Sequence, residues 1–569
     1  MKDAEHDWDE QTDLLVIGSG AGGLTAALVG ALQGLAVIVA EKTPQFGGTS
    51  ATSGGAIWIP ASSQAARAGY HDSPESGEHY LRHELEEHAR QDLISAFIAS
   101  GPAMVDLLEQ RSSVVFDSVG MPDYHPDQPG GMAAGRVLTA KPFDGRKLGA
   151  DFKLLGSPLR RLMVLGGMMV PVSEVPLMIQ PFKSLRAFTT TVRNLARHAS
   201  DRLRFHRGTR LFNGNALIAR LFYSLRQLSA DLRVNTSLVE LILQGGQVRG
   251  ALLQTAAGEW RVRARCGVVL ATGGAAQASA LQQDLMKNFP HRHTVAHQGA
   301  TGDGLRAALA AGGLVDRNVS SPAVWTPASV MHEKDGTTTV FPYGYLDRGK
   351  PGAIAVNQSG RRFVNEANSY HDVVQAMFSQ AREAGEVPRG HLVCDSDFMR
   401  RYGFGIIRPR DVKLHRYIQQ GYVCEGQTLR ELAGKIGVDP DGLVATVDRH
   451  NGYALTGVDE EFGKGTTAFN HFNGDPTVKP NPNLAPIAKA PFYALPITPA
   501  TLSVSTGLKT DADAQVLDQQ DRPIGALYAC GNDMASVMRG YCPAGGVILG
   551  PAMVFGYRAA LHASRKPAD

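Results

Sequence analysis

The chain has 569 residues, of which 43% are hydrophobic and 20% charged, and its formal net charge is +3. This length exceeds what one hydrophobic core supports, so we expect two or more domains, and the near-balanced charge excludes the electrostatic signature of a nucleic-acid-binding protein. The five cysteines are scattered and odd in number, which favours neither a disulfide framework nor a metal site.

The first predicted element is a buried parallel strand over residues 13–17, which ends in a glycine-rich turn. The glycines are spaced G-x-G-x-x-G: Gly18, Gly20 and Gly23. An alanine-rich helix follows, and the free N–H groups at the start of such a helix favour phosphate. A second apolar strand at residues 36–40 leads into Glu41, close to where an acidic residue that binds a ribose is expected. This stretch predicts a dinucleotide-binding domain.

A second loop of small residues covers positions 47–58. Taken alone, it is also compatible with a flexible surface loop. Joined to the first motif, it resembles the flavoprotein family of fumarate reductase, succinate dehydrogenase and the 3-ketosteroid dehydrogenases. In that family the loop contacts the pyrophosphate and the isoalloxazine of FAD. Members with covalent flavin carry a histidine where this chain has Gly48, so the resemblance implies non-covalent FAD.

Two loops rich in proline and glycine come next, at residues 121–131 and 141–149, after a predicted helical stretch at 74–112. They resemble the ketosteroid-dehydrogenase segments D-Y-x-P-x-x-P-G-G and P-F-D-x-R-x-L-G. This narrows the resemblance to the 3-ketosteroid dehydrogenases. It implies that Tyr124 assists proton transfer, with a packed aromatic side chain as the alternative interpretation.

Residues 162–179 are strongly apolar, and basic residues flank them on both sides. The run is too short and too interrupted to cross a bilayer, which takes about 20 apolar residues, and Glu174 would be costly at its centre. One interpretation is a segment of the protein core. The other is a membrane-contact segment over residues 160–186 that dips into the headgroup region, with its cations on anionic lipid.

The remaining glycine-rich strand ends return the chain to the cofactor. A buried strand ends in A-T-G-G at residues 271–274, and residues 524–533 resemble the strand end that contacts the ribityl chain. The resemblance assigns the following residues to FAD: Gly18, Gly20, Ala21, Gly22, Gly23, Glu41, Lys42, Gly48, Thr49, Ser50, Ser53, Gly54, Gly55, Val239, Ala271, Thr272, Gly273, Gly531, Asn532, Gly546, Val547 and Leu549.

We therefore predict an α/β fold, α+β overall. Residues 1–296 and 491–569 are expected to form a Rossmann-like FAD-binding domain that is discontinuous in sequence. Residues 297–490 are expected to form an inserted α+β catalytic domain that caps the substrate, because the sequence pattern changes there.

Dehydrogenation of a carbon–carbon bond beside a ketone needs a base for the α proton, an acceptor for the β hydride, and hydrogen-bond donors for the developing enolate. In the resembling family tyrosines and a glycine N–H serve the proton and the enolate, and flavin N5 takes the hydride. The resemblance places the base at Tyr345 or Tyr343, each of which could equally be a packed aromatic residue.

The sequence departs from the family pattern at the enolate site. Counting back from residues 549–552 puts the expected tyrosine on Cys542 and the glycine on Gly546, with Tyr541 one place off. Either Tyr541 substitutes through a local shift, or the enzyme lacks this donor and performs related chemistry.

The sequence thus predicts flavin-dependent α,β-dehydrogenation of a 3-ketosteroid, with 1,2-dehydrogenation favoured over 4,5-dehydrogenation. The alternative is a fumarate- or succinate-type reductase of the same family, in which Arg348 would donate the proton. A second dinucleotide fingerprint is not evident, so we expect an external, quinone-like electron acceptor. The polar N-terminus and the cysteine usage favour the cytoplasm, with peripheral contact at the cytoplasmic membrane as an option.

Overall fold

The computed structural model describes residues 7–159, 162–291, 293–333, 335–344 and 347–565. Its larger part is built on a sheet with the strand order β10-β2-β1-β13-β12-β24-β23, and β11 pairs with β12. These strands are β1 (Glu10–Ile17), β2 (Val37–Ala40), β10 (Asp231–Arg233), β11 (Ser237–Gln244), β12 (Gln247–Thr255), β13 (Gly258–Leu270), β23 (Gln515–Leu517) and β24 (Pro523–Ala529). Strands β10, β2, β1, β13 and β24 are parallel neighbours, whereas β12 runs antiparallel to β13.

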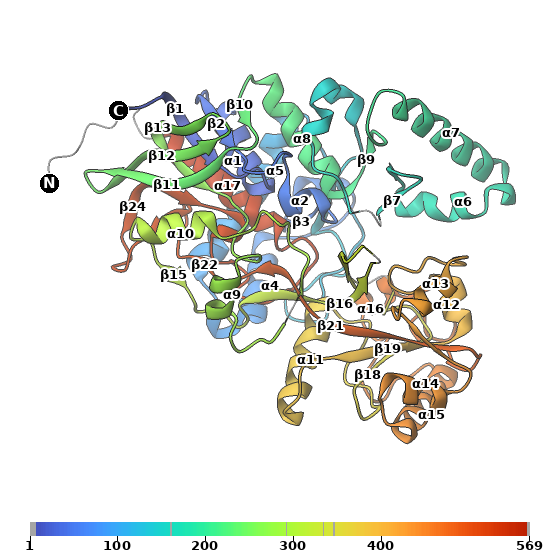
Figure 1. Cartoon of the computed structure of the whole chain (residues 1–569). Coiled ribbons are helices and arrows are strands. Elements are labelled where there is room, and N and C mark those ends of the chain that lie inside the picture. The colour runs from blue at the N-terminus through green and yellow to red at the C-terminus, as the bar shows by residue number, and fades with distance from the viewer. Residues whose placement is uncertain (1–6, 160–161, 292, 334, 345–346, 566–569) are drawn as a thin grey trace.

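Helices from both ends of the chain cover this sheet, and Figure 1 shows the blue N-terminal helix α1 beside the red C-terminal helix α17. The helices are α1 (Ala21–Leu32), α2 (Gly48–Thr52), α3 (Ser63–Arg67), α4 (Pro74–Leu85), α5 (Gln91–Arg111), α8 (Asn213–Gln227), α9 (Ser279–Leu285), α10 (Asp303–Ala310) and α17 (Leu549–Ser564). Gly556 allows the close contact of α17 with α1, because a Cβ there would lie 2.4 Å from the carbonyl oxygen of Gly22. The predicted discontinuous Rossmann-like architecture is confirmed.

A second sheet has the order β17-β16-β21-β19-β18, with β14 and β20 paired to β21. Its strands are β14 (His293–Thr294), β16 (Ala323–His332), β17 (Thr338–Pro342), β18 (Ala353–Val356), β19 (Gly390–Cys394), β20 (Cys424–Gly426) and β21 (Phe492–Val504). The helices of this part are α11 (Tyr370–Ala384), α12 (Ser396–Tyr402), α13 (Leu414–Gln419), α14 (Leu429–Ile436), α15 (Pro440–Thr456) and α16 (Ala468–Asn473). Most of the sheet comes from residues 297–490, while β14 and β21 lie just outside that range.

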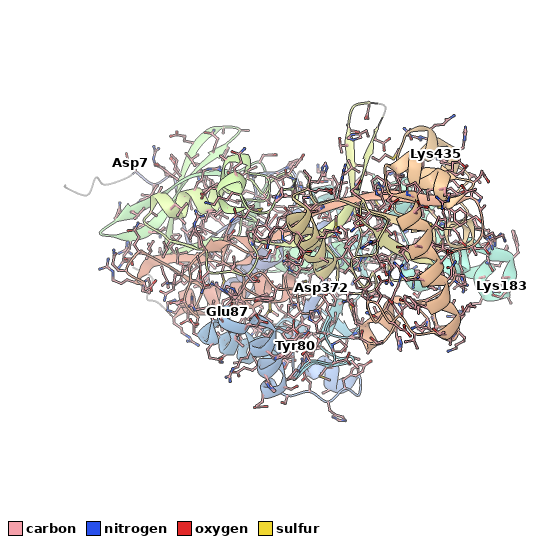
Figure 2. The ribbon with its side chains drawn as sticks, turned by 90° about the horizontal axis from the view of Figure 1, so that it is seen from below. Asp7, Tyr80, Glu87, Lys183, Asp372 and Lys435 are labelled. Atoms are coloured by element: carbon pink, nitrogen blue, oxygen red, sulfur yellow. The ribbon has the colours of Figure 1, made fainter. Side chains whose placement is uncertain are left out.

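Short elements connect the two parts and build a lobe at one edge. A small sheet has the order β3-β5-β4, and β15 pairs with β22. These strands are β3 (Ala56–Trp58), β4 (Phe116–Ser118), β5 (Val137–Ala140), β15 (Val315–Asp316) and β22 (Gly507–Leu508). The lobe contains β6 (Phe143–Asp144), β7 (Met163–Val164), β8 (Met168–Met169), α6 (Val175–Ile179), α7 (Leu185–Arg202) and β9 (Arg210–Leu211). In Figure 1 the helices α6 and α7 project from the body, and in Figure 2 Lys183 lies at the outer edge of the molecule.

The exposure of the lobe's side chains tests the core interpretation of residues 162–179. Gly167, Met168 and Met169 are buried, whereas most of the other described side chains in this run are half-buried or exposed. The interpretation as a core segment is therefore wrong for most of the run. Among the helices of the described ranges, none combines the length and apolarity needed to cross a bilayer.

Candidate active site

The glycine-rich turn after β1 is packed so tightly that two of its positions accept only glycine. Gly18 has a φ of +103°, and a Cβ there would lie 2.2 Å from the carbonyl oxygen of Ala271. A Cβ on Gly23 would lie 2.2 Å from the carbonyl oxygen of Gly18. At Gly20, by contrast, the nearest atom is Ser50 Oγ, 3.6 Å away. The turn is thus closed toward the sheet and open at the N-terminus of α1, where a phosphate binds.

Glu41, at the carboxyl end of β2, is held in one orientation by four hydrogen bonds. One oxygen accepts from the Ser19 N–H at 3.2 Å and from its hydroxyl at 2.5 Å. The other accepts from the Thr43 N–H at 2.9 Å and from its hydroxyl at 2.8 Å. The carboxylate is 8% exposed, so it presents a fixed acceptor beside the phosphate turn. The neighbouring Lys42 forms an ion pair with Asp303 at 2.5 Å.

The other predicted cofactor segments converge on this turn. Ser50 Oγ accepts from the Ala21 N–H at 3.1 Å. Asp533 accepts from the N–H and the hydroxyl of Thr272 and, at 3.0 Å, from the Gly274 N–H. Burial raises the pKa of Asp533 to about 6. The strand ends at residues 271–274 and 531–533 are therefore fixed to each other.

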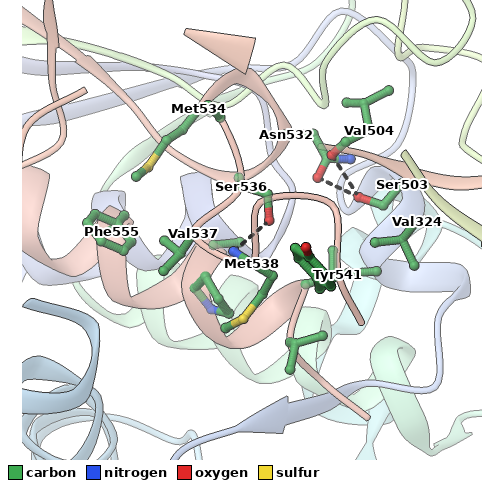
Figure 3. A pocket seen from close by; sticks show the side chains of 16 residues that line it. Val324, Ser503, Val504, Asn532, Met534, Ser536, Val537, Met538, Tyr541 and Phe555 are labelled. Atoms are coloured by element: carbon green, nitrogen blue, oxygen red, sulfur yellow. Dashed lines mark hydrogen bonds between the residues drawn. The ribbon is translucent and has the colours of Figure 1, made fainter. Parts of the chain in front are cut away.

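A pocket that opens to solvent lies beside these strand ends (Figure 3). Gly531, Asn532 and Val547, all assigned to the cofactor from the sequence, line it together with side chains from β16, β21 and α17. Ser503 donates to Asn532 Oδ1 at 2.9 Å. Val239 lies apart on β11 and is 50% exposed. An open helix N-terminus, a fixed carboxylate and a pocket at the strand ends together fit the phosphates, the ribose and the ring system of FAD.

Tyr124 belongs to a buried aromatic cluster that the sequence did not fully predict. Its ring meets that of Tyr370 edge-on at 5.7 Å and that of Phe469 at 4.6 Å. Cys542 Sγ donates to the Tyr370 hydroxyl at 3.5 Å. Burial, together with Cys542 and Tyr124, raises the pKa of Tyr370 well above 10. Segments about 170 to 250 residues apart in sequence thus meet at one point.

The other residues predicted to be catalytic lie in different places. Tyr343 is buried in the core of the second part, where its pKa is raised by burial and by Tyr422. Tyr345 lies outside the described residues. Tyr541 lines the pocket, and its hydroxyl donates to Glu86 at 3.5 Å. Gly546 has a φ of +97°, and a Cβ there would lie 2.6 Å from the backbone of Ile57. Of the pair Tyr541 and Cys542, the thiol is the one that contacts Tyr370.

Tyr370 was not among the site residues predicted from the sequence, although its position at a capped helix start is visible in the sequence. It begins α11 directly after Ser369, whose side chain caps the helix together with Asp372. The sequence R-x-F-x-N-E ends at Glu366, and Tyr370 follows four residues later. The N-terminal position on a helix is favourable for a hydroxyl that becomes negative during a reaction.

A buried arginine supports the loop that carries Tyr124. Arg136 donates to Asp72 at 2.8 and 3.0 Å and to Asp123 at 2.9 Å. Asp123 also accepts from the indole N–H of Trp58 at 2.7 Å. Two carboxylates face one guanidinium here, and burial, with Asp72 adding to it, raises the pKa of Asp123 to about 6.

A second buried arginine supports the segment that leads to Tyr370. Arg362 donates to Glu366 at 2.9 Å through two nitrogens and to Asp459 at 3.0 and 2.9 Å. Lys464 pairs with the same Glu366 at 3.1 Å. Burial alone would raise the pKa of Glu366, but the two cations hold it well below its usual range. Its fully buried members are two cations and two anions, and the partly exposed Glu461 adds a third carboxylate 3.8 Å from Arg362.

Arg348, the proton donor of the reductase alternative, is engaged elsewhere. It is 1% exposed and donates to the backbone carbonyls of Gly344, Glu366 and Asn368 at 2.8, 2.6 and 2.5 Å. It therefore fixes the turn before α11. Burial lowers the pKa of Arg348 to about 10, and an anion at Tyr124 would interact favourably with its charge.

Metal chemistry has no evident site in the part of the chain that the structure describes, since no group of three His, Cys, Asp or Glu side chains could hold an ion. All five cysteines are free thiols.

The family model described as "FAD binding domain" matches residues 13–549. The chain is 38% identical to 4-oxocyclohex-2-ene-1-carboxylate 5-dehydrogenase of Sinomonas cyclohexanicum, over 97% of this chain and 94% of that protein. It is 34% identical to 3-oxosteroid 1-dehydrogenase of Mycobacterium tuberculosis, over 97% and 98%. The crystal structure of 3-ketosteroid delta1-dehydrogenase from Sterolibacterium denitrificans superposes with a TM-score of 0.89 at 33% identity, over 98% of this chain and 99% of that one.

Proposed function

The chain belongs to the FAD binding domain family, among the flavoproteins that include the 3-oxosteroid 1-dehydrogenases, and we propose that it introduces a double bond beside the ring ketone of a 3-ketosteroid. It is an FAD-dependent oxidoreductase that acts on CH–CH bonds, and 1,2-dehydrogenation is favoured over 4,5-dehydrogenation. The observation that carries the proposal is the contact of Tyr124, Tyr370 and Cys542 in one buried cluster.

The proton acceptor in this proposal is the neighbouring pair of Tyr370 and Tyr124, and Tyr345, which lies outside the described residues, stays the alternative base. A phenol with its usual pKa of about 10 is a weak base at neutral pH, so one hydroxyl of the pair must lose its proton in the reactive form. The charge of Arg348 and the N-terminus of α11 both favour that anion. FAD, when bound, accepts the hydride that leaves the β carbon.

The enolate oxygen requires donors at the site where relatives of this type carry a tyrosine and a glycine. Gly546 offers its backbone N–H, and Cys542 offers a thiol, which is a weaker donor than a hydroxyl. Burial raises the pKa of Cys542 to about 12, so the thiol keeps its proton at neutral pH and remains a donor. Tyr541, whose hydroxyl reaches Glu86, has a less favourable position for this role.

A smaller ring ketone is a second candidate substrate, because a relative at 38% identity is named for a 4-oxocyclohexene carboxylate. Both substrate classes carry a ketone on a six-membered ring and lose hydrogen from the adjacent C–C bond. The fumarate alternative is disfavoured because the relatives at 38% and 34% identity are named for ring ketones.

Turnover with an artificial electron acceptor tests the proposal. We expect activity with a 3-ketosteroid, and loss of activity by roughly 10²-fold or more in Tyr370→Phe and in Tyr124→Phe, the scale of a general acid–base group. Tyr343→Phe is the matched control and should retain activity. Turnover of 4-oxocyclohexanecarboxylate but not of the steroid would select the second candidate. Turnover of succinate alone would refute both.

Non-covalent attachment of FAD is proposed because Gly48 stands where covalent members carry a histidine. A Cβ at Gly48 would have no atom within 4 Å, so this position faces open space rather than packed protein. Acid precipitation should release the flavin into the supernatant. Yellow colour that stays on the pellet would contradict the proposal.

We further propose that the lobe, through its described residues 159 and 162–203, rests on an anionic membrane surface. We also propose that the electron acceptor is a lipid-soluble quinone. Exposed large apolar side chains gather in this lobe: Leu159, Leu165, Val175, Ile179, Phe182, Leu185, Phe188, Val192, Leu195 and Leu203. Phe182 and Leu185 at the tip are 87% and 79% exposed. The exposed cations Lys183, Arg186 and Arg193 lie among them, which suits anionic headgroups.

Flotation with vesicles of phosphatidylglycerol and phosphatidylcholine tests the membrane contact. The wild type should float with the vesicles at low salt, and Phe182→Ser combined with Leu185→Ser should abolish flotation. Val412→Ser is the matched control, because Val412 is 96% exposed but lies outside the lobe. A wild type that stays in the soluble fraction at low salt, or dimerises through the lobe instead, would refute the contact.

A further inference from the structure

His125 follows Tyr124 directly and bridges two carboxylates on different helices. Its Nδ1 lies 2.7 Å from Glu84 on α4, and its Nε2 lies 3.1 Å from Asp372 on α11. A carboxylate oxygen only accepts hydrogen bonds, so both ring nitrogens must carry a proton to satisfy this arrangement. The geometry therefore requires the imidazolium form.

The two carboxylates belong to different parts of the molecule. Helix α4 packs against α5 in the cofactor-binding part, whereas α11 packs against β16 of the second sheet. The loop before His125 is anchored to the cofactor-binding part, since the Tyr124 N–H donates to the carbonyl of Pro543 at 2.8 Å. Figure 2 labels Asp372, and Tyr80 of α4 below it, near the middle of the molecule.

Asp372 lies two residues after Tyr370 on the first turn of α11 and also accepts from the Ser369 N–H at 3.2 Å, as part of the helix cap. Any shift of Asp372 therefore moves Tyr370 as well. His125 holds the turn that carries Tyr370 against the loop that carries Tyr124.

We propose that Glu84, His125 and Asp372 form an ionic latch between the two parts of the molecule, which keeps the two tyrosine rings in contact and closes the site over Cys542. His125 is a positioning residue here, since it acts through Tyr124 and Tyr370. The effect on turnover rests on the proposed function, but the latch itself does not.

The surroundings of His125 favour its charged form across the neutral range. Burial alone would lower its pKa, but Asp372 and Glu84 raise the pKa of His125 to about 10. The other polar and titratable groups near this latch are Tyr80, Arg348, His371 and Cys542. Above pH 10 one ring nitrogen loses its proton, and one carboxylate then faces a lone pair instead of a donor.

Alkylation of Cys542 at pH 7, followed by peptide mass spectrometry on the FAD-loaded protein, tests the latch without any substrate. Cys542 is 3% exposed, so it reacts only when the two parts separate. In His125→Gln we expect alkylation about 10-fold faster, because local opening exposes the thiol. Cys424, half-buried on β20, serves as the internal reference and should not change.

Two further variants separate the latch from general damage. His125→Arg retains a charge and donors for both carboxylates, so it should restore slow alkylation. His83→Gln is the matched control. His83 lies on α4 like Glu84 and contacts the loop of His125 at Gln128, 2.8 Å away, without an ion pair. Alkylation of Cys542 in His125→Gln within about twofold of the wild type would overturn the latch.

Turnover supplies the second readout. In His125→Gln kcat should fall about 10²-fold with a smaller change in KM, since misplaced groups slow the chemical step. The wild type should lose activity as the pH rises through 10, where both His125 and Arg348 lose their charge, and His125→Arg should lose less because only Arg348 then titrates. An unchanged alkaline loss in His125→Arg would overturn the positioning role. If no ring ketone reacts but the alkylation results hold, the proposed function fails and the latch stands.

Discussion

The two buried arginine networks behind the tyrosine pair look alike but differ in charge. Arg136 and two aspartates form the network that supports the Tyr124 loop. This network has a surplus of negative charge, because two carboxylates face one guanidinium. Arg362 supports the segment before Tyr370 with Glu366 and Asp459, and Lys464 supplies a second buried cation that balances these two buried carboxylates. Burial raises the pKa of Asp123 in the first network, whereas the cations lower the pKa of Glu366 in the second. Two similar arrangements around a buried arginine thus shift the pKa of a carboxyl group in opposite directions.

The largest expected effect comes from breaking the balanced network. Glu366→Gln leaves two buried cations with Asp459 as their only fully buried anion, since the Glu461 side chain is 30% exposed and lies 3.8 Å from Arg362. An undercompensated buried charge of this kind costs about 3–5 kcal/mol. Urea unfolding measures the loss. The exposed Glu431→Gln, which removes an ion pair to Lys435 at 2.6 Å, should leave the free energy of unfolding nearly unchanged. A loss below 1 kcal/mol in Glu366→Gln would contradict the balance.

Asp123→Asn should cost less than Glu366→Gln. It weakens the acceptors for Trp58 and Arg136, but it also removes the surplus buried charge, so we expect a loss of about 1–2 kcal/mol, the scale of one hydrogen bond to a charged group. The same urea unfolding experiment gives the comparison. Equal losses in the two variants would mean that the charge surplus has no energetic consequence.

The third expected effect is a difference in pH dependence. Asp123 has a pKa of about 6 in the folded protein, against an unperturbed value of about 3.9. Between these values the folded protein binds a proton that the unfolded chain has released, so lowering the pH from 6 to 4 should stabilise the wild type relative to Asp123→Asn. Unfolding free energies measured at several pH values check this sign. A difference that shrinks as the pH falls would refute it.

Some features of the site depend on one short stretch of sequence, whereas others form only where distant segments meet in the fold. This difference explains what the sequence could predict. Three features of the cofactor site are local patterns that can be read from neighbouring residues. They are the turn at Gly18, Gly20 and Gly23, the acidic residue Glu41, and the strand end at residues 271–274. The tyrosine cluster depends on contacts between segments far apart in sequence. A pattern count could therefore place a base near residues 343–345, but only the packing of α11 brings Tyr370 to Tyr124.

Distance along the chain also limited the interpretation of the lobe and of residues 541–542. Hydropathy alone could not tell whether residues 162–179 are buried, because that depends on which neighbours cover them. Likewise, counting along the chain left Tyr541 and Cys542 open. The structure turns Tyr541 toward Glu86 and Cys542 toward Tyr370, which follows from the backbone path and not from residue type.

Anaerobic flavin reduction in a single turnover tests the central claim most directly, because it isolates the step in which the tyrosine pair removes the α proton. Mixed with a 3-ketosteroid, the wild type and Tyr343→Phe should bleach rapidly. Tyr370→Phe should bind the steroid but bleach roughly 10²-fold more slowly. Bleaching of Tyr370→Phe at the wild-type rate, or loss of bleaching in Tyr343→Phe alone, would contradict the assignment of the base to Tyr370.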